Sequence, residues 1–148
     1  MSSTTSSYKS SKHHELAPSR TALTIPAIAP PNGNYSHSNT IPSSRSIVYL
    51  SGFMGDLPGD GRIISGGVAA QTTQIMRNLK AVLVASGSGL DRIAQRRVFL
   101  VDMGDLKTVD RIWGEWIKEP FPVSTCVQIV RLVKEDAKVE IEVVAETK

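Results

Sequence analysis

Three small side chains that could act as nucleophiles stand together in the segment FPVSTCVQIVRL, residues 121–132. Ser124, Thr125 and Cys126 follow an aromatic-proline turn and begin an alternating apolar strand. A nucleophilic hydroxyl or thiol needs a nearby base, and that base needs a group that orients it. No histidine lies near Cys126 in sequence, and a triad built with His37 would lack a supporting carboxylate. We therefore expect these residues to line a pocket, with the cysteine packing as a small apolar side chain.

Acid-base chemistry is available from three other side chains. Glu140 lies in the alternating segment VEIEVVA, where a carboxylate either faces solvent or acts as a general base. His37 could exchange protons near neutral pH if its loop reaches a cleft, and Tyr35 lies two residues before it. A metal centre is not indicated, because the other histidines, His13 and His14, lie near the N-terminus and no Cys/His cluster has metal-ligand spacing.

The bulk properties are those of one soluble globular domain. The chain has 148 residues, of which 41% are hydrophobic and 21% are charged. No apolar run approaches the roughly 20 residues that a membrane-spanning helix needs. One cysteine cannot form an internal disulfide, and nothing resembles a signal peptide, so we expect a reducing compartment.

The net charge of +3 is concentrated near the N-terminus. Residues 1–45 carry four basic side chains and one acidic side chain, whereas residues 46–148 carry 13 of each sign. A neutral folded part without a basic-aromatic platform argues against a nucleic-acid partner.

The first 20 residues are Ser-rich and almost free of apolar side chains, so we expect a disordered leader over 1–20 and a folded domain over 21–148. A mitochondrial transit peptide is the alternative, since the leader is Ser-rich and mildly basic. Glu15 and the lack of an arginine-bearing amphipathic face argue against it, and we expect a cytoplasmic protein.

Hydrophobic periodicity predicts the elements that must position these groups. Strands are expected over 21–25, 46–52, 62–65, 96–103, 124–132 and 138–146, and helices over about 68–86 and 106–118. The apolar stripe of the first helix comprises Val68, Thr72, Ile75, Met76, Leu79, Val82 and Leu83, and that of the second comprises Val109, Ile112, Trp113 and Trp116. Gly87 and Gly89 end the first helix.

This order of elements favours an α+β fold with two helices on one face of a mixed sheet. The second face of such a sheet must be covered, and its edges must be paired or protected. In a chain of this size, a homo-oligomer that packs its sheets together meets both requirements.

Four separated blocks of the chain resemble the RidA/YjgF family. NGNYSHS is similar to its GPYSQ/H-A motif, and YLSGFMGDLPGDGRIISGGVAAQTTQIMRNLKAVLVASG to its central SGQ…G…Q-T-xQ…N-(L/I)-KAxLxAAG block. VFLVDMGDLKTVDRIWGEWI resembles VFLxDMNDFxxVNxxYxxYF, and FPVSTCVQIVRLVKEDAKVEIEVVA resembles FPARSCVxVAxLPKxAxVEIExIA. The resemblance runs from about 32 to 145.

The resemblance implies a chorismate-mutase-like subunit in a homotrimer, with small-molecule ligands bound in clefts between subunits. Typical members hydrolyse reactive 2-enamine or 2-imine acids to 2-keto acids and ammonia, without a cofactor or a metal. An arginine holds the substrate carboxylate, and a water linked to a glutamate attacks the imine carbon. The residues matching the family's motifs are Tyr35, Ser51, Gly52, Cys126 and Glu140.

Three positions depart from the family pattern. The arginine of the PARSC motif falls on Ser124, the glutamine after Ser-Gly on Phe53, and the asparagine of DMND on Gly104. A serine offers one weak donor and no charge, so a small 2-imino acid should bind several kcal/mol less well. The resemblance with these departures predicts a roomier cleft for a bulkier or less anionic imine or enamine, as a specialised biosynthetic pathway could supply.

Two alternatives stay open. The chain could be a conventional 2-iminobutanoate/2-iminopropanoate deaminase in which Arg131 or Arg97 replaces the lost arginine. It could also be a ligand-binding or chaperone-like trimer without enzymatic activity.

Overall fold

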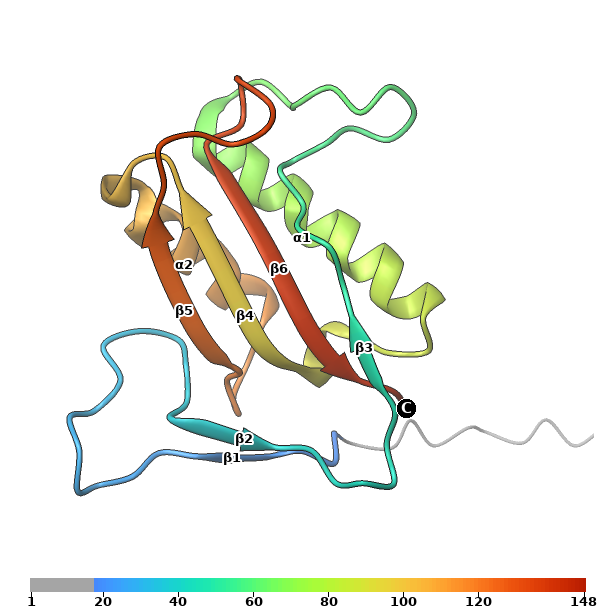
Figure 1. Cartoon of the computed structure of the whole chain (residues 1–148), viewed down its shortest axis with the longest axis vertical. Helices are drawn as coiled ribbons and strands as arrows, with labels where there is room; N and C mark the ends of the chain where they lie inside the picture. The colour runs from blue at the N-terminus through green and yellow to red at the C-terminus, as the bar shows by residue number, and fades with distance from the viewer. Residues whose placement is uncertain (1–17) are drawn as a thin grey trace, which may run out of the picture.

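A computed structural model describes residues 18–148, so the leader expected to be disordered lies almost wholly outside the described residues. The described chain has the expected α+β architecture, with both helices on one face of a mixed sheet (Figure 1). Its elements are β1 (Thr21–Leu23), β2 (Ser38–Thr40), β3 (Ile47–Tyr49), α1 (Gly67–Ala85), β4 (Ile93–Leu100), α2 (Leu106–Trp116), β5 (Val123–Gln128) and β6 (Val139–Glu146).

The main sheet has the strand order β3-β6-β4-β5. β6 runs antiparallel to β3 and to β4, whereas β5 runs parallel to β4. Since α2 joins the two parallel strands, β4-α2-β5 is a crossover unit. β1 and β2 form a separate two-stranded sheet beyond one end of the main sheet (Figure 1).

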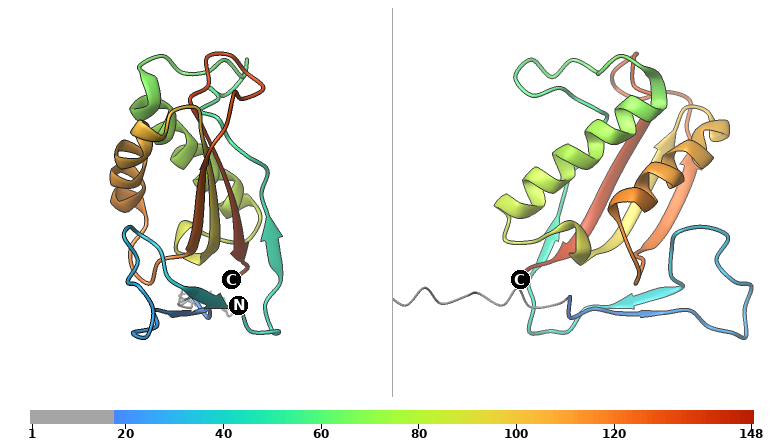
Figure 2. Two further views of the ribbon diagram at one scale, coloured as in Figure 1. Left: turned by 60° about the vertical axis from the view of Figure 1, so that its left-hand side comes forward. Right: turned by 180° about the vertical axis from the view of Figure 1, so that it is seen from behind.

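The helices and the sheet enclose one main core (Figure 2). Ile75, Met76, Leu79 and Leu83 of α1 are fully buried, and so is Trp113 of α2. The sheet contributes residues that alternate along its two central strands, namely Val98, Leu100, Val139, Ile141 and Val143. The periodicity therefore located both helices and their buried faces.

Two sequence-based expectations about the elements are wrong, and one strand was not predicted. Residues 62–65 form no strand, because only Ile63 bridges to Asp56. The unpredicted strand is β2, the second of the three strands before α1. Its three residues carry no apolar alternation. Val82 was placed in the buried stripe but is 38% exposed, since it lies about 100° around the helix from Leu83.

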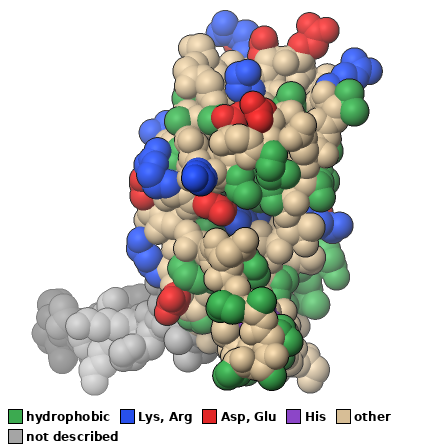
Figure 3. Space-filling model, turned by 90° about the vertical axis from the view of Figure 1, so that its left-hand side faces the viewer, with side chains coloured by type: hydrophobic (Ala, Val, Ile, Leu, Met, Phe, Trp, Pro, Cys, Tyr) green, Lys and Arg blue, Asp and Glu red, His purple; other side chains and the backbone are tan. Residues whose placement is uncertain are grey.

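The sheet face opposite the helices carries both carboxylates and apolar side chains. Register places Glu140 beside Phe99 on this face, and exposed apolar residues include Tyr49 (76%) and Val127 (41%). Seen from the β5 edge, charged side chains gather over the helix layer, whereas apolar ones lie toward the open face (Figure 3). Exposed apolar surface of this kind marks a candidate interaction surface.

Candidate active site

A β-bulge after β3 brings Gly52 against the Glu140 side chain. The Leu50 N–H donates to the Val143 carbonyl at 3.0 Å, and Phe53 exchanges two backbone hydrogen bonds of 3.0 Å with Ile141. Between these contacts, Ser51 and Gly52 lie opposite a single residue of β6. Two residues on one strand opposite one on its partner define a β-bulge. A Cβ at Gly52 would lie 1.8 Å from Glu140 Oε1, so only glycine leaves this carboxylate its place.

The electrostatic surroundings of Glu140 favour its protonated form. Partial burial raises the pKa of Glu140 above its ordinary value, and the negative charges of Glu142 and Asp56 raise it further. A carboxylate with a raised pKa is a stronger base once it is ionised, which suits proton transfer near neutral pH.

A cavity of about 440 Å³ adjoins the bulge. Its lining comprises Gly52, Phe53, Asp56, Leu57, Pro58, Asn78, Ala81 and Val82. Phe53 also packs against the main core, and Asn78 Nδ2 donates to the Asp56 carbonyl at 2.9 Å. The aromatic ring makes this wall apolar, as expected from the sequence, while Asn78 and Asp56 supply polar atoms at its edge.

The position of the family arginine, Ser124, lies beside a guanidinium from the neighbouring strand. Arg96 is its register partner on β4, and Arg96 Nε donates to Ser124 Oγ at 2.9 Å. Serine itself carries no charge, but the Arg96 guanidinium lies directly beside it. The two replacement cations suggested by the sequence lie elsewhere, because Arg97 pairs with Glu142 on the opposite face and Arg131 is exposed beyond β5.

Cys126 and Thr125 occupy opposite faces of β5. The Cys126 side chain is half-buried and packs against the main core. Burial raises the pKa of the Cys126 thiol, and the charge of Arg96 offsets only part of that increase. The thiol is thus protonated at neutral pH and is a poor nucleophile. Thr125 is exposed, next to Arg97 in the register.

Tyr35 and His37 lie in the loop between β1 and β2. Tyr35 Oη donates to Asn32 Oδ1 at 3.1 Å. His37 Nδ1 accepts from the Ile25 N–H at 2.8 Å, so the neutral ring carries its proton on Nε2, 3.0 Å from the Ala29 carbonyl. Both ring nitrogens of His37 therefore hold the loop together.

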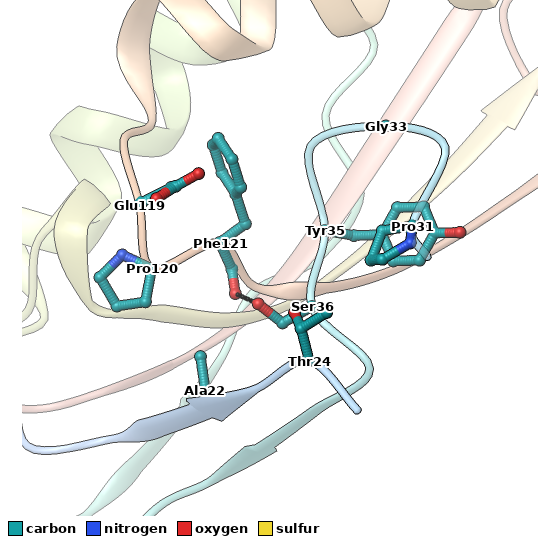
Figure 4. Close-up of a pocket in the computed structure, with 9 residues that line it drawn as sticks. All are labelled: Ala22, Thr24, Pro31, Gly33, Tyr35, Ser36, Glu119, Pro120 and Phe121. Atoms are coloured by element: carbon teal, nitrogen blue, oxygen red, sulfur yellow. Dashed lines mark hydrogen bonds between the residues drawn. The ribbon is translucent and has the colours of Figure 1, made fainter. Parts of the chain in front are cut away.

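This loop forms one wall of a second cavity, of about 480 Å³ (Figure 4). Its lining comprises Ala22, Thr24, Pro31, Gly33, Tyr35, Ser36, Glu119, Pro120 and Phe121. The Ser36 hydroxyl donates to the Phe121 carbonyl at 2.8 Å and ties the loop to the segment before β5. Tyr35 therefore lies near the segment that precedes β5 and not beside Glu140.

One chain therefore holds the candidate residues in two separate groups. The strand register places Ser124 of β5 opposite Val143 of β6, with β4 between them. Glu140 lies three residues from Val143 along β6. With strands about 4.8 Å apart and a rise of about 3.3 Å per residue, the two backbones are roughly 14 Å apart. The Glu140 side chain also lies on the opposite face. A small substrate can contact both groups only if a second copy brings one group to the other.

No group of three His, Cys, Asp or Glu side chains within residues 18–148 is arranged to hold a metal ion. None of the helices in this part of the chain combines the length and apolarity that crossing a bilayer requires.

Comparison with known proteins identifies the class of protein that this fold and site define. The family profile described as "Endoribonuclease L-PSP" matches residues 11–147. The chain belongs to this family, the RidA/YjgF family, as its sequence motifs indicated.

Relatives in the family include named deaminases. Human 2-iminobutanoate/2-iminopropanoate deaminase is 35% identical over 98 residues, covering 66% of this chain and 71% of the human protein. Reactive Intermediate Deaminase A, chloroplastic, from Arabidopsis thaliana is 33% identical over 102 residues, covering 69% of this chain. The chain spans only 54% of the length of that plant relative. Because other relatives are named as chloroplastic or mitochondrial, the cytoplasmic location stays a prediction.

Solved structures show the same fold. Yeast Mmf1 aligns with a TM-score of 0.65 and 28% identity, covering 87% of this chain and 99% of the yeast chain. The Rid-family protein YyfB of Yersinia pestis aligns with a TM-score of 0.75 at 22% identity, covering 85% of this chain and 97% of its own, which shows the fold alone.

Arg96 and its carboxylate partner Asp110 were not among the predicted site residues. Their ion pair joins β4 to α2, with Arg96 Nη2 2.9 Å from Asp110 Oδ1. A charged residue at the start of the predicted strand RRVFLVDM was a visible signal, since charged side chains are rarely buried without a partner. Only the strand register shows that this arginine faces Ser124.

Proposed function

We propose that this chain hydrolyses reactive imines or enamines to a carbonyl compound and ammonia. The names of relatives that are 33–35% identical support a RidA-like imine-deaminase function. An enamine first tautomerises to the imine. The oxygen of water then bonds to the imine carbon, the carbon–nitrogen bond breaks, and the nitrogen leaves as ammonia with both protons of the water.

The observation that carries this proposal is the Glu140 carboxyl held against Gly52 with a raised pKa. Ionised Glu140 accepts a proton from the attacking water and returns it to the departing nitrogen. The missing side chain at Gly52 leaves the space that the Glu140 carboxylate occupies. Cys126 takes no part as a nucleophile in this scheme, because its thiol stays protonated.

We further propose that the site is a cleft between copies of a homotrimer. The separation of Ser124 and Glu140 within one chain supports this assembly, and so does the apolar open face of the sheet. The small-molecule ligand would contact the Ser124 group of one copy and the Glu140 group of another.

The substrate that we propose is bulkier or less anionic than a small 2-imino acid. Phe53 gives the cavity beside Gly52 an apolar wall, and Gly104 has no side chain to donate a hydrogen bond. The guanidinium behind Ser124 does not restore an unpaired cation, because Asp110 neutralises it.

Ammonia release tests the hydrolase proposal, with imines that lack a carboxylate generated in the assay by an amine oxidase and 2-imino acids generated by an amino-acid oxidase. Glu140→Gln keeps the shape of the side chain and removes the base, so kcat should fall by about 100-fold or more. Glu135→Gln, an exposed carboxylate in the turn before β6, is the matched control and should leave kcat unchanged. Equal rates for wild type and Glu140→Gln would instead favour the ligand-binding or chaperone-like trimer.

A further inference from the structure

A buried guanidinium with one unused end lies behind the β5 edge of the sheet. Arg96 is 2% exposed and stacks on Trp113, with its central carbon 4.6 Å from the ring centroid. Nε donates to Ser124 Oγ and Nη2 to Asp110 Oδ1, each at 2.9 Å. Nη1 is buried and has no hydrogen-bond partner among the described residues. The cation is thus fixed in place and directed at Ser124.

The Ser124 hydroxyl is left with a hydrogen to donate. A hydroxyl has one donor hydrogen and two acceptor lone pairs, and Arg96 Nε already occupies one lone pair. Ser124 donates to no other group in the part of the chain that the structure describes. A hydrogen bond accepted from a cation polarises the hydroxyl and makes its O–H a stronger donor. Ser124 is partly exposed, so a ligand can reach it.

The charges around this donor sum to zero. Arginine grips a carboxylate with two parallel N–H groups, and in Arg96 the groups on Nε and Nη2 are already taken by Ser124 and Asp110. A ligand carboxylate at Ser124 would gain one donor and would face the negative charge of Asp110, which is 26% exposed. The Cys126 thiol beside it is neutral, because burial raises its pKa. An uncharged carbonyl oxygen would accept the same hydrogen without that repulsion.

We infer that Ser124, polarised by Arg96, binds an uncharged carbonyl oxygen of the substrate. The substrate class is an imine or enamine with an amide, ester or ketone carbonyl where an imino acid has its carboxylate. This inference rests on the proposed function for the reacting imine group and adds the group beside it. Ser124 contacts the ligand, whereas Arg96 and Asp110 are positioning residues that set the charge.

A matched pair of stable product analogues tests the inference. 2-Oxobutanamide and 2-oxobutanoate differ only in the group expected at Ser124, which is an uncharged amide in one and a carboxylate in the other, and isothermal titration calorimetry gives Kd for each with the full chain. Wild type should bind the amide at least about tenfold more tightly, because the acid must give up its hydration and face the negative charge of Asp110, whereas the amide does neither. Tighter binding of the acid, or binding of neither compound, would overturn the inference.

Two substitutions should move the ratio of the two Kd values in defined directions. Ser124→Ala removes the donor and should weaken amide binding by about 10-fold to 100-fold, with less change for the acid, because repulsion by Asp110 offsets the hydrogen bond that the acid gains from Ser124. Asp110→Asn keeps the acceptor for Arg96 but removes the negative charge, so the acid should bind at least about fivefold more tightly. Glu115→Gln removes an exposed carboxylate from the same helix and should leave the ratio unchanged. Because each variant is judged by a ratio, partial unfolding cannot mimic the result, and an unchanged ratio in Ser124→Ala and Asp110→Asn contradicts the inference.

The inference and the proposed function can fail separately. Preferential amide binding without ammonia release from any imine would refute the hydrolase and leave the carbonyl site standing. Rapid, Glu140-dependent hydrolysis of imino acids, with tighter binding of 2-oxobutanoate, would refute the carbonyl site and leave the hydrolase standing.

Discussion

Adding one methyl group at Gly52 should disable the site without unfolding the protein. In Gly52→Ala the new Cβ would meet Glu140 Oε1 at 1.8 Å, whereas ordinary contact begins at 3.4 Å. The carboxylate must therefore move by roughly 1.6 Å, the difference between these distances. A displacement of about 1 Å at a reacting group can cost about 100-fold in rate, which corresponds to about 2.7 kcal/mol of transition-state stabilisation.

Folding stability should barely change in Gly52→Ala. Replacing glycine stabilises the fold by about 0.4–1 kcal/mol through the unfolded chain, provided that its φ suits alanine. Gly52 does not have the positive φ that six other glycines have. An off-rotamer Glu140 side chain costs about 0.5–1.5 kcal/mol, so the two effects nearly cancel.

The assay pairs ammonia release with urea denaturation of the same protein samples, and a double-mutant cycle isolates the cause. If Gly52→Ala acts only by displacing Glu140, then adding it to Glu140→Gln should cause no further loss of kcat. Rate losses that multiply in the double variant, or a Gly52→Ala protein with wild-type kcat, would refute the assignment of Glu140 as the displaced base.

Three further predictions concern pH, assembly and the core. Glu142→Gln removes one of the charges that raise the pKa of Glu140, so the acidic limb of the kcat/KM profile should move to lower pH. An acidic limb that does not move would show that this limb does not report the ionisation of Glu140. Val127→Asp puts a charge on the open face of the sheet, which is the face that we propose as the trimer interface. Size-exclusion chromatography with light scattering should then show the mass of one chain in place of three. A variant that remains a trimer would show that the interface lies elsewhere. Leu79→Ala should lower the free energy of unfolding by about 2–5 kcal/mol in urea, because Leu79 is fully buried, whereas Val82→Ala on the same helix should change it by less than about 1 kcal/mol; equal losses would contradict the observed helix orientation.

Local patterns located most of the fold because each pattern reflects a local cause. Helix α1 follows from apolar residues at helical spacing and ends where Gly87 takes a positive φ of 71°. β6 follows from the alternation of apolar residues and glutamates over Val139–Val143, and its burial alternates as far as Ala145. The pairing of β1 with β2 could not be read in this way, because a three-residue polar strand carries no periodic signal and exists only through its partner.

The candidate site was only half visible for a similar reason. Motif positions identified Gly52 and Glu140, and the structure adds the bulge that presses them together. At Ser124 the sequence showed the loss of an arginine but not the guanidinium that lies beside it. Arg96 is 28 positions away in the chain, and a pairing over that distance is set by strand register and not by local pattern.

The amino-acid sequence by itself determined the family, the class of fold and the identity of the residues that differ from the family pattern, because motifs and periodicity are properties of neighbouring residues. Only the tertiary structure decided the electrostatic character of the Ser124 wall. Burial, strand register and the packing of α2 on β4 fix where the charges of Arg96 and Asp110 lie, and each of these depends on contacts between distant parts of the chain.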